Sequence, residues 1–417
     1  MTEPLTVCLH GRAVGSLAQD AAGKLTFTYA AAWLADPLNP PLSLALPLKL
    51  EPFDDAGTKP FFANLLPEAE VRRHLADSLG LSEGNDFALL RAIGGDCAGA
   101  VSVLPPGVEL PQGGSFRPVA KARLAKLLDE LPQRPLLADG DDDEIRLSLA
   151  GAQYKLPVFV ASDDNVFLPV GSYASSHILK PPNKTFPDLV ANEFFCMRLA
   201  EAAGLPVPKV SVRQVGFPVY QIERYDRAPA SPSPLRLHQE DFCQALGLGP
   251  DQKYEAENGP TLARCFQLVD EVSVQPAVDR LALLRWTIFN LLVGNADAHA
   301  KNLSLLLEGG PKLAPFYDLV STAIVPRLSK KQAMRIGGEN EWIKVHAKRW
   351  DRFAEETNMT ARLVRDEVAT LAEALPGHAA SVMSAAAEAL PSETYAAIGA
   401  EVARRSISVL TNLAKGA

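Results

Sequence analysis

The sequence has few cysteines and no closely spaced cysteine pair. Its five cysteines are scattered over 417 residues, and no two of them form a CxxC motif. A disulfide framework needs an even, regularly spaced set, and a zinc site usually needs paired Cys or His ligands. Neither is therefore predicted, and we expect the protein to work in the reducing environment of the cytoplasm.

The sequence also lacks a long uninterrupted apolar segment. The first residues, MTEPLTVCLHGRAVGSL, do not show the basic region and apolar core of an export signal. The longest apolar stretch, LALLRWTIFNLLVG, contains Arg285 and is shorter than the roughly 20 residues of a membrane-spanning helix. We therefore expect no export and no membrane partner.

Positive charge is not in excess either. The 41 Lys and Arg residues are outnumbered by 49 Asp and Glu residues, so the net charge is -8. Broad electrostatic binding to nucleic acid or to an anionic membrane is therefore disfavoured, although a local basic patch is still compatible with it. The stretch KVHAKRWDR at 344–352 could touch DNA, but a solvated helix face is the simpler interpretation.

What the sequence does contain is enough apolar residues for more than one core. With 417 residues, of which 47% are hydrophobic, two or three domains are expected. Residues 1–105 begin with the strand-like segments LTVCLH and KLTFTYA and continue with a helical pattern that ends at Gly80. This pattern predicts a small β-rich module completed by helices.

The next 120 or so residues favour a second β-rich unit. Residues 106–143 are interpreted as a connector that includes the short amphipathic helix KARLAKLLDEL. From 144 to 226, the clusters IRLSLAG, LPVFVA, SSHILK, VSVRQV and FPVYQIERY alternate with turn residues around one helix, DLVANEFFCMRLAEAAG. This pattern is typical of a twisted antiparallel sheet with one helix packed on it.

Long helical patterns dominate after Arg227 and continue almost to the end of the chain. We therefore predict an α+β protein with two lobes. Residues 1–105 form an extra N-terminal subdomain, 106–226 form the rest of a β-rich N-lobe, and 227–417 form an all-α C-lobe. Ligands tend to bind in the cleft that such an arrangement leaves between its lobes.

The stretch NLLVGNADAHAKN at 290–302 places polar residues directly after an apolar helix that Gly294 can end. Asp297 and Asn302 are five positions apart, as are the catalytic Asp and the magnesium-binding Asn in the catalytic loop of protein kinases. Taken alone, the segment is also compatible with side chains that bond their own backbone in a turn.

A second carboxylate follows 21 positions after Asp297, in the segment PFYDLVS. Magnesium is a hard cation that is held by one or two carboxylates together with substrate phosphates. Asn302 and Asp318 would suffice as its ligands, provided that the phosphates are held elsewhere.

The β-rich half contains candidates for holding phosphates. The segment SLAGAQYK at 148–155 has a Gly and two Ala, small enough for backbone amides to approach phosphate oxygens. Lys180 ends an extended segment like the strand lysine of kinases, and Glu193 follows 13 residues later, where it could pair with this lysine. An exposed edge-strand lysine is the alternative.

The segment YQIERYDR at 220–227 joins the two halves. An adenine ring needs a backbone donor and acceptor beside a flat apolar slot. Glu223 and Tyr225 could present these main-chain groups, and Asp226 could reach the ribose. A surface strand with alternating charge is the alternative if the other pieces are ignored.

Together these segments resemble the HipA-type serine/threonine kinases, the toxin halves of bacterial toxin–antitoxin pairs. The resemblance rests on SLAGAQYK, HILKPP, ERYDR, HQEDFCQALG, VGNADAHAKN and PFYDLVS. The N-terminal segments LHGRAVGSL and PLSLALPL…FFANLLPE are similar to that family's N-terminal subdomain, so the resemblance covers roughly residues 4–375. It implies a two-lobed protein-kinase-like fold.

The resemblance also implies roles for individual residues. Asp297 would be the catalytic base, and Asn302 and Asp318 would hold magnesium. Ser148 would be autophosphorylated, which would expel the adjacent loop and switch the enzyme off, because a phosphate adds nearly two negative charges. An ordinary strand serine is the alternative. The residues implied to bind ATP are Ala150, Gly151, Ala152, Gln153, Tyr154, Lys155, Lys180, Glu223, Arg224, Tyr225, Asp226, His299, Ala300, Lys301, Asn302, Tyr317 and Asp318.

The partners follow from the same resemblance. A helix-turn-helix antitoxin similar to HipB would bind the kinase in a heterotetramer and connect it to operator DNA, and the substrate would be a protein such as an aminoacyl-tRNA synthetase. Two alternatives stay open. One is a catalytically idle kinase fold that acts as co-repressor with the antitoxin. The other is a small-molecule kinase of the aminoglycoside-phosphotransferase kind, which would leave the N-terminal module and the Ser148 loop unexplained.

Overall fold

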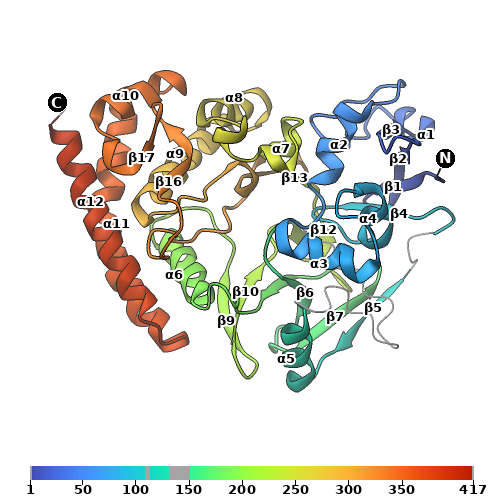
Figure 1. The fold of residues 1–417 in the computed structure, drawn as a ribbon, viewed down its shortest axis with the longest axis horizontal. Helices are drawn as coiled ribbons and strands as arrows, with labels where there is room; N and C mark the ends of the chain where they lie inside the picture. Colours follow the sequence, from blue (N-terminus) through green and yellow to red (C-terminus); the bar gives the residue numbers. More distant parts are fainter. Residues whose placement is uncertain (1, 109–112, 132–150, 416–417) are drawn as a thin grey trace.

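A computed structural model of the protein describes residues 2–108, 113–131 and 151–415. The strand-rich part comes first and the helical part second, as the α+β prediction requires. Figure 1 shows the N-terminal module at one side of the molecule and the long helices α11 (Ala361–Ala389) and α12 (Thr394–Ala414) at the opposite side. The largest sheet lies between them.

The N-terminal module is built on an antiparallel four-stranded sheet. In spatial order its strands are β3 (Leu25–Tyr29), β2 (Arg12–Gln19), β1 (Leu5–Leu9) and β4 (Val101–Leu104). Its helices are α1 (Ala31–Leu34), α2 (Asp55–Ala63), α3 (Ala69–Leu79) and α4 (Asp86–Ile93). The helical pattern predicted to end at Gly80 is α3, and Gly80 caps it with φ of +63°. Sheet and helices enclose a core of their own, in which Phe27 and Phe62 are fully buried.

The second sheet is antiparallel throughout and has six strands. In spatial order these are β5 (Gly114–Pro118), β7 (Val166–Gly171), β6 (Leu156–Val160), β8 (His177–Lys180), β10 (Pro218–Glu223) and β9 (Val210–Gln214). The sequence predicted this sheet and its helix α6 (Leu189–Ala202). Residues 145–150 of the predicted strand IRLSLAG lie outside the described residues.

Within the described part of residues 106–143, the helix predicted at KARLAKLLDEL is present, but the interpretation as a mere connector is wrong, because the segment adds a strand and a helix to a core. Residues 114–118 form the edge strand β5, and α5 (Lys121–Glu130) packs Leu124 and Leu128 into the same core as Val158 of β6. The strand was missed because GSFRP is short and only partly buried, so it shows no alternation of apolar and polar residues.

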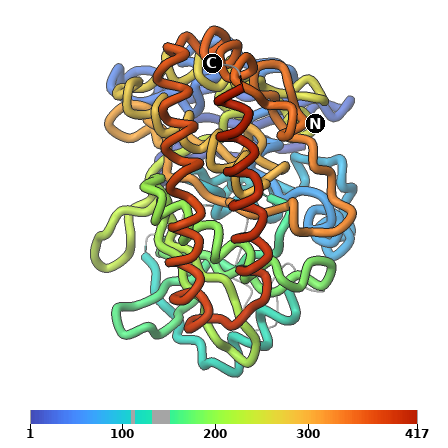
Figure 2. Tube along the Cα trace, turned by 90° about the vertical axis from the view of Figure 1, so that its left-hand side faces the viewer, coloured from blue at the N-terminus to red at the C-terminus, as the bar shows by residue number. Residues whose placement is uncertain are grey.

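Helix α6 is buried on almost every side. It contacts strands β9 and β10 and also α11 and α12, and the ring of Phe195 stacks on that of Tyr395 with centroids 5.1 Å apart. Figure 2 shows α11 and α12 running side by side along one face of the molecule. The helix of the N-lobe is therefore held in place by the C-terminal helices.

The C-lobe is mainly helical. Its helices are α7 (Phe242–Ala245), α8 (Leu262–Val272), α9 (Pro276–Val293), α10 (Ala347–Glu356), α11 and α12, with 3-10 turns η1 (Pro250–Gln252), η2 (Glu255–Glu257), η3 (Ala300–Asn302) and η4 (Trp342–Lys344). The prediction of an all-α lobe did not include its short strands. These are β11 (Arg227–Ala228), β12 (Leu235–Arg236), β13 (Gln239–Asp241), β14 (Ser304–Leu306), β15 (Lys312–Leu313), β16 (Lys331–Ile336) and β17 (Glu339–Glu341). Six of them have too few residues for a recognisable period of two, and β16, with six residues, does not alternate strictly between apolar and polar residues.

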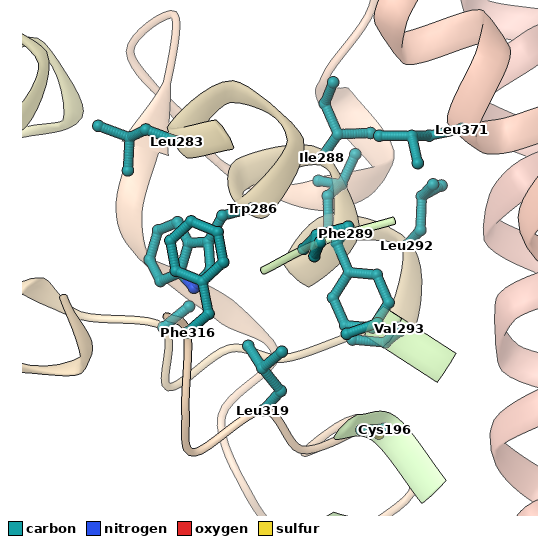
Figure 3. Packing of buried hydrophobic residues seen from close by; sticks show 14 of the residues in the cluster. Cys196, Leu283, Trp286, Ile288, Phe289, Leu292, Val293, Phe316, Leu319 and Leu371 are labelled. Carbon is teal, nitrogen blue, oxygen red and sulfur yellow. The ribbon is translucent and has the colours of Figure 1, made fainter. Parts of the chain in front are cut away.

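Helix α9 forms the centre of the C-lobe core, as its apolar sequence predicts. Figure 3 shows Trp286 beside Phe316, with ring centroids 6.1 Å apart, and Phe289 and Leu292 on another side of the helix. The helix ends at Gly294, whose φ is +76°. The loop that follows Gly294 is therefore anchored to a rigid core.

The predictions about disulfides and about membrane-spanning helices can be compared with the structure. All five cysteines are buried and none is in a disulfide. Among the helices of residues 2–108, 113–131 and 151–415, none has both the length and the apolar composition that crossing a membrane requires.

Replacing Gly294 by Ala should destabilise the protein more than the same change at Gly204. Both glycines have left-handed backbones, with φ of +76° and +77°. That conformation costs an L residue about 1–2 kcal/mol. A Cβ at Gly294 would lie 2.6 Å from the Cβ of Ala323, whereas nothing lies within 4 Å at Gly204. We expect an additional loss of about 1–3 kcal/mol for G294A, measured as the free energy of unfolding in urea. Equal losses for the two variants would contradict this steric explanation.

Candidate functional site

A cavity of about 560 Å³ lies where the two lobes meet. Its walls come from the segment after residue 150, strand β8, the link after β10, the loop after α9 and the segment around residue 318. The structure thus brings together segments that the sequence placed up to about 170 positions apart. The predicted site residues that line the cavity are Gly151, Ala152, Gln153, Lys155, Lys180, Glu223, Arg224, Tyr225, Asp226, Asp297, His299, Lys301, Asn302, Tyr317 and Asp318.

The other predicted residues are placed differently. The hydroxyl of Tyr154 bonds to Nδ1 of His74 in the N-terminal module, and the two rings stack with centroids 6.2 Å apart. Ala300 is fully buried and is not among the residues that line the cavity. Ser148 and Ala150 lie outside the described residues.

Lys180 forms the charged centre of the cavity. Its ammonium group, at the end of β8, donates a hydrogen bond to Oε1 of Glu193 on α6 at 2.7 Å. It also donates to Oδ1 of Asp318. The pairing of Lys180 with Glu193 that the sequence suggested is therefore present, and the alternative of an exposed edge-strand lysine is wrong because Lys180 is buried.

The three charges of this cluster control one another's protonation. Burial alone would lower the pKa of Lys180, but the negative charges of Asp318 and Glu193 outweigh burial and raise it. Burial would likewise raise the pKa of Asp318, yet the charges of Lys180 and Lys155 hold it well below its usual range. Burial raises the pKa of Glu193 to about 7 although Lys180 opposes the shift. The lysine therefore stays charged and Asp318 stays ionised.

A second lysine stands beside Lys180. Burial, together with the positive charge of Lys180, lowers the pKa of Lys155 to about 8. Gly151 leaves room for it, because its φ is +112° and an added Cβ would lie only 2.7 Å from Nζ of Lys155. Two ammonium groups in one cavity make it suited to a polyanion such as a polyphosphate.

The segment that begins at Gly151 is attached to the N-terminal module. The carbonyl oxygen of Gly151 accepts a hydrogen bond from the backbone N–H of Glu68 at 3.1 Å, and Pro67 and Gly151 form a parallel β-bridge. In this arrangement the small-residue segment is held by a part of the chain more than 80 positions away.

The loop after α9 holds Asp297 at the rim of the cavity. Asp297 is exposed, and its backbone N–H is bonded by Oδ1 of Asn295 at 3.1 Å. The amide oxygen of Asn302 accepts from the N–H of His299 at 3.2 Å and so shapes the same turn. His299 is buried, which lowers its pKa and keeps the ring neutral. Backbone bonding by Asx side chains, the alternative left open for this segment, thus occurs at Asn295 and Asn302, while Asp297 itself is exposed at the rim.

The segment that follows Asp318 is tied to both α6 and the loop after α9. Ser321 exchanges two hydrogen bonds with the side-chain amide of Asn192, at 2.7 and 2.9 Å. The hydroxyl of Thr322 bonds the carbonyl oxygen of Gly294 at 3.0 Å and the N–H of Ala296 at 2.8 Å. These bonds hold Asp318 near Lys180 although its backbone has φ of +54°, an unfavourable value for a residue other than Gly.

In the link between the lobes, two of the groups predicted to bind the nucleotide already have partners within the fold. The N–H of Glu223 donates to the carbonyl oxygen of Lys209 at 2.9 Å, so this N–H is not available to a ligand. The carboxylate of Asp226 is buried and bonds Arg224 at 2.6 and 2.9 Å and the N–H of Gly99 at 2.9 Å. The partners of this carboxylate are thus groups of the fold itself. Tyr225 stacks on Tyr317 with centroids 5.6 Å apart.

Several residues at the site were not found from the sequence. Nζ of Lys301 lies 2.9 Å from Oδ2 of Asp241 and 3.5 Å from Oε1 of Glu68, and it also donates to Oδ1 of Asn64. Asn64 and Glu68 belong to the N-terminal module, and no spacing in the sequence connects them to the loop after α9. Their only signal was the family resemblance, since Asp241 lies in the segment HQED, and Asn64 and Glu68 lie in FFANLLPE.

Comparisons with known proteins agree on one family. The model of the HipA N-terminal domain matches residues 5–104, and that of the HipA-like C-terminal domain matches residues 147–379. The protein Y4mE of Sinorhizobium fredii, named as a kinase, is 46% identical over 387 residues, which is 91% of each chain. The serine/threonine-protein kinase toxin HipA of Shewanella oneidensis is 34% identical over 362 residues, 82% of this chain and 81% of that one. The solved structure of Shewanella oneidensis HipA with HipB and operator DNA aligns with a TM-score of 0.84 at 31% identity, covering 99% of this chain and 98% of that one.

The affinity of the cavity for ATP should fall as the pH rises past the pKa of Lys155. This pKa is about 8, so the ammonium is charged below that pH and neutral above it. Losing one favourable charge contact of about 1.4 kcal/mol corresponds to about tenfold weaker binding. We expect this loss between pH values of about 7 and 9.5, measured by isothermal titration calorimetry.

Lys155→Met provides the control for this titration. The variant should bind ATP more weakly at neutral pH, and most of the decline with rising pH should disappear. If wild type and K155M lost affinity in parallel, another group would be responsible for the pH dependence.

Proposed function

Because the chain belongs to the HipA family of serine/threonine kinase toxins, whose kinase-like fold it shares, we propose that it transfers the γ-phosphate of ATP to a serine or threonine hydroxyl of a protein. The observation that supports this most directly is the cluster of Lys180, Glu193 and Asp318, of which Lys180 and the half-buried Asp318 line the same cavity as Asp297. Kinases need this combination of a paired lysine, a metal-binding carboxylate and a catalytic Asp.

In the proposed reaction, catalysis is mostly positioning and charge neutralisation. Asp297 accepts the proton of the substrate hydroxyl, for which its exposed position at the rim is suitable. The hydroxyl oxygen then bonds to the γ-phosphorus, and the bond from that phosphorus to the bridging oxygen breaks, which leaves ADP. Lys180 and Lys155 supply positive charge to the phosphates.

The residues present fit a magnesium ion. Asp318 offers a carboxylate and Asn302 an amide oxygen, which accepts one hydrogen bond from the N–H of His299 and has a second lone pair; both are hard ligands, and both residues line the cavity. Within the described part of the chain, no group of three or more His, Cys, Asp or Glu residues could hold a metal. A site shared by one carboxylate, one amide and the phosphates of ATP does not need such a group. When bound, the ion would neutralise charge on the transferred phosphoryl group.

The link between the lobes is proposed to hold the adenine. Tyr225 and the carbonyl oxygen of Glu223 are the candidates, because the N–H of Glu223 is used within the sheet. The family resemblance adds Arg224, although its side chain serves to neutralise Asp226.

The proposed partners come from the family. The Shewanella oneidensis relative was solved with HipB and its operator DNA. By analogy we propose a HipB-like helix-turn-helix antitoxin, bound in a heterotetramer, as the partner of this chain, with operator DNA reached through the antitoxin. The proposed substrate is a protein of the translation machinery such as an aminoacyl-tRNA synthetase.

The variant Asp297→Asn should lose phosphate transfer. Removing the general base costs roughly 10²- to 10⁴-fold in rate, while affinity for ATP should change little, because Asp297 is exposed at the rim of the cavity. Transfer of label from radioactive ATP to the protein measures the rate, and isothermal titration calorimetry measures the affinity for ATP. Asp366→Asn, which removes an exposed carboxylate from α11, is the control.

An active D297N would show that Asp297 is not the base. ATP binding by wild type without any transfer would favour the idle co-repressor instead.

Incubation with ATP should place a phosphate on Ser148 and weaken later nucleotide binding. A phosphate carries nearly two negative charges, and it would compete with ATP for Lys155 and Lys180. Mass spectrometry of the incubated protein should find phosphoserine at position 148. Binding of a fluorescent ATP analogue should fall after incubation for wild type and not for Ser148→Ala. Loss of binding by the Ala variant as well would disprove this switch.

A further inference from the structure

Tyr254 reaches the rim of the cavity from a loop that the proposed mechanism does not use. It lies between η1 and η2, in the connection from α7 to α8. Its hydroxyl donates a hydrogen bond to Oδ1 of Asp297 at 2.6 Å, across 43 positions of sequence. The distance is typical of a hydroxyl bonded to an ionised carboxylate, a stronger bond than one between neutral groups.

The backbone of Tyr254 is held by a tight turn. Its carbonyl oxygen accepts hydrogen bonds from the N–H groups of Glu257 and Gly259, both at 2.9 Å. Asn258 between them has φ of +64°, and a Cβ on Gly259 would lie 2.6 Å from the carbonyl oxygen of Tyr254. The turn therefore accepts only a glycine at position 259, and it fixes the position of the Tyr254 backbone.

The ring of Tyr254 is held as firmly as its backbone. It packs edge-to-face against the ring of His299, with centroids 5.1 Å apart and an interplanar angle of 84°. Nζ of Lys253 lies 5.4 Å from the ring centroid and is in turn 2.7 Å from Oε2 of Glu68. Glu68 also bonds the carbonyl oxygen of Gly151 through its backbone N–H. One connected set of contacts thus runs from Asp297 to Gly151, in the segment SLAGAQYK, which is a candidate for holding phosphates.

The bond to Asp297 is not explained by a need to satisfy a buried group. Asp297 is exposed, so water could solvate its carboxylate, and a hydrogen bond at such a place adds little to stability. Burial, and next the negative charge of Asp297, raise the pKa of Tyr254, so its hydroxyl keeps its proton and always acts as a donor. A carboxylate has two oxygens, and the bond to Oδ1 leaves Oδ2 for a substrate hydroxyl.

We propose that Tyr254 is a positioning residue that fixes the carboxylate of Asp297 in the orientation needed to accept the substrate proton. The inference rests on the proposed role of Asp297 as the base. The backbone of Asp297 is already bonded by Asn295, and Tyr254 restrains the remaining freedom of its side chain. Reacting groups must be aligned closely, and small misplacements can cost as much as about a hundredfold in rate.

Tyr254→Phe tests this proposal, because it removes one oxygen atom and keeps the ring that packs on His299 and Lys253. Transfer of label from radioactive ATP to the chain itself is followed over a range of ATP concentrations. We expect the rate at saturating ATP to fall about tenfold or more, while the ATP concentration at half-saturation stays unchanged. A purely structural role would leave the rate intact or weaken ATP binding and stability together.

Two further variants make the test specific. Tyr173→Phe removes a hydroxyl from a half-buried tyrosine that packs on Phe116 in the six-stranded sheet, and it should behave as wild type. In an Asp297→Asn background, Y254F should cause no additional loss, because the two side chains act as one unit. Additive losses would overturn the proposal.

The possible results separate this proposal from the one on which it rests. Absence of transfer by wild type would refute the kinase function. If wild type transfers phosphate and D297N does not, an unchanged rate for Y254F would refute the positioning role alone. A faster Y254F would also refute it, because the hydroxyl would then be occupying the place of the substrate.

Discussion

The cavity between the lobes depends on one buried ammonium group, that of Lys180. It bonds Glu193 from α6 and Asp318 from the segment after the C-lobe core, and so joins the six-stranded sheet to both. Removing one partner from a buried ion pair typically costs about 3–5 kcal/mol, because the other charge is left without compensation. The packing of α6 against α11 and α12 makes this arrangement rigid, since Glu193 cannot move without disturbing the C-lobe core.

The N-terminal module takes part in the site as well as covering it. Asn64 and Glu68 bond Lys301 of the loop after α9, and farther away Leu44 and Ser43 bond the buried carboxylate of Glu240. Buried polar groups need well-placed partners, so a contact of this kind specifies one relative position where an apolar contact would tolerate several. The module thus helps to determine the position of the loop that holds Asp297.

The parts of the site that the sequence predicted are those with a local signature. Asp297 and Asn302 follow an apolar helix that ends at a glycine, and Lys180 ends a strand, so their chemistry could be inferred from neighbouring residues. Glu68 and Tyr254 have no such pattern, because each acts through contacts with segments that are distant in the sequence. The ribose role of Asp226 stays a prediction. Its place in the link suggested a ribose ligand, but its observed partners are Arg224 and the backbone of Gly99.

The sequence by itself determined the long helices and most strands of the larger sheets, though not β5 or the short strands of the C-lobe, and it showed which segments bring reactive side chains. The apolar faces of α6 and α9, the glycine at 294 and the order of the charged residues are all written in local patterns. Tertiary structure alone decided which of these groups meet. Lys180 and Asp318 are 138 positions apart, and their contact exists because two lobes and a module pack around one cavity. Spacing along a chain encodes only neighbours within a turn or a strand, whereas contacts between distant segments are set by the packing of whole elements.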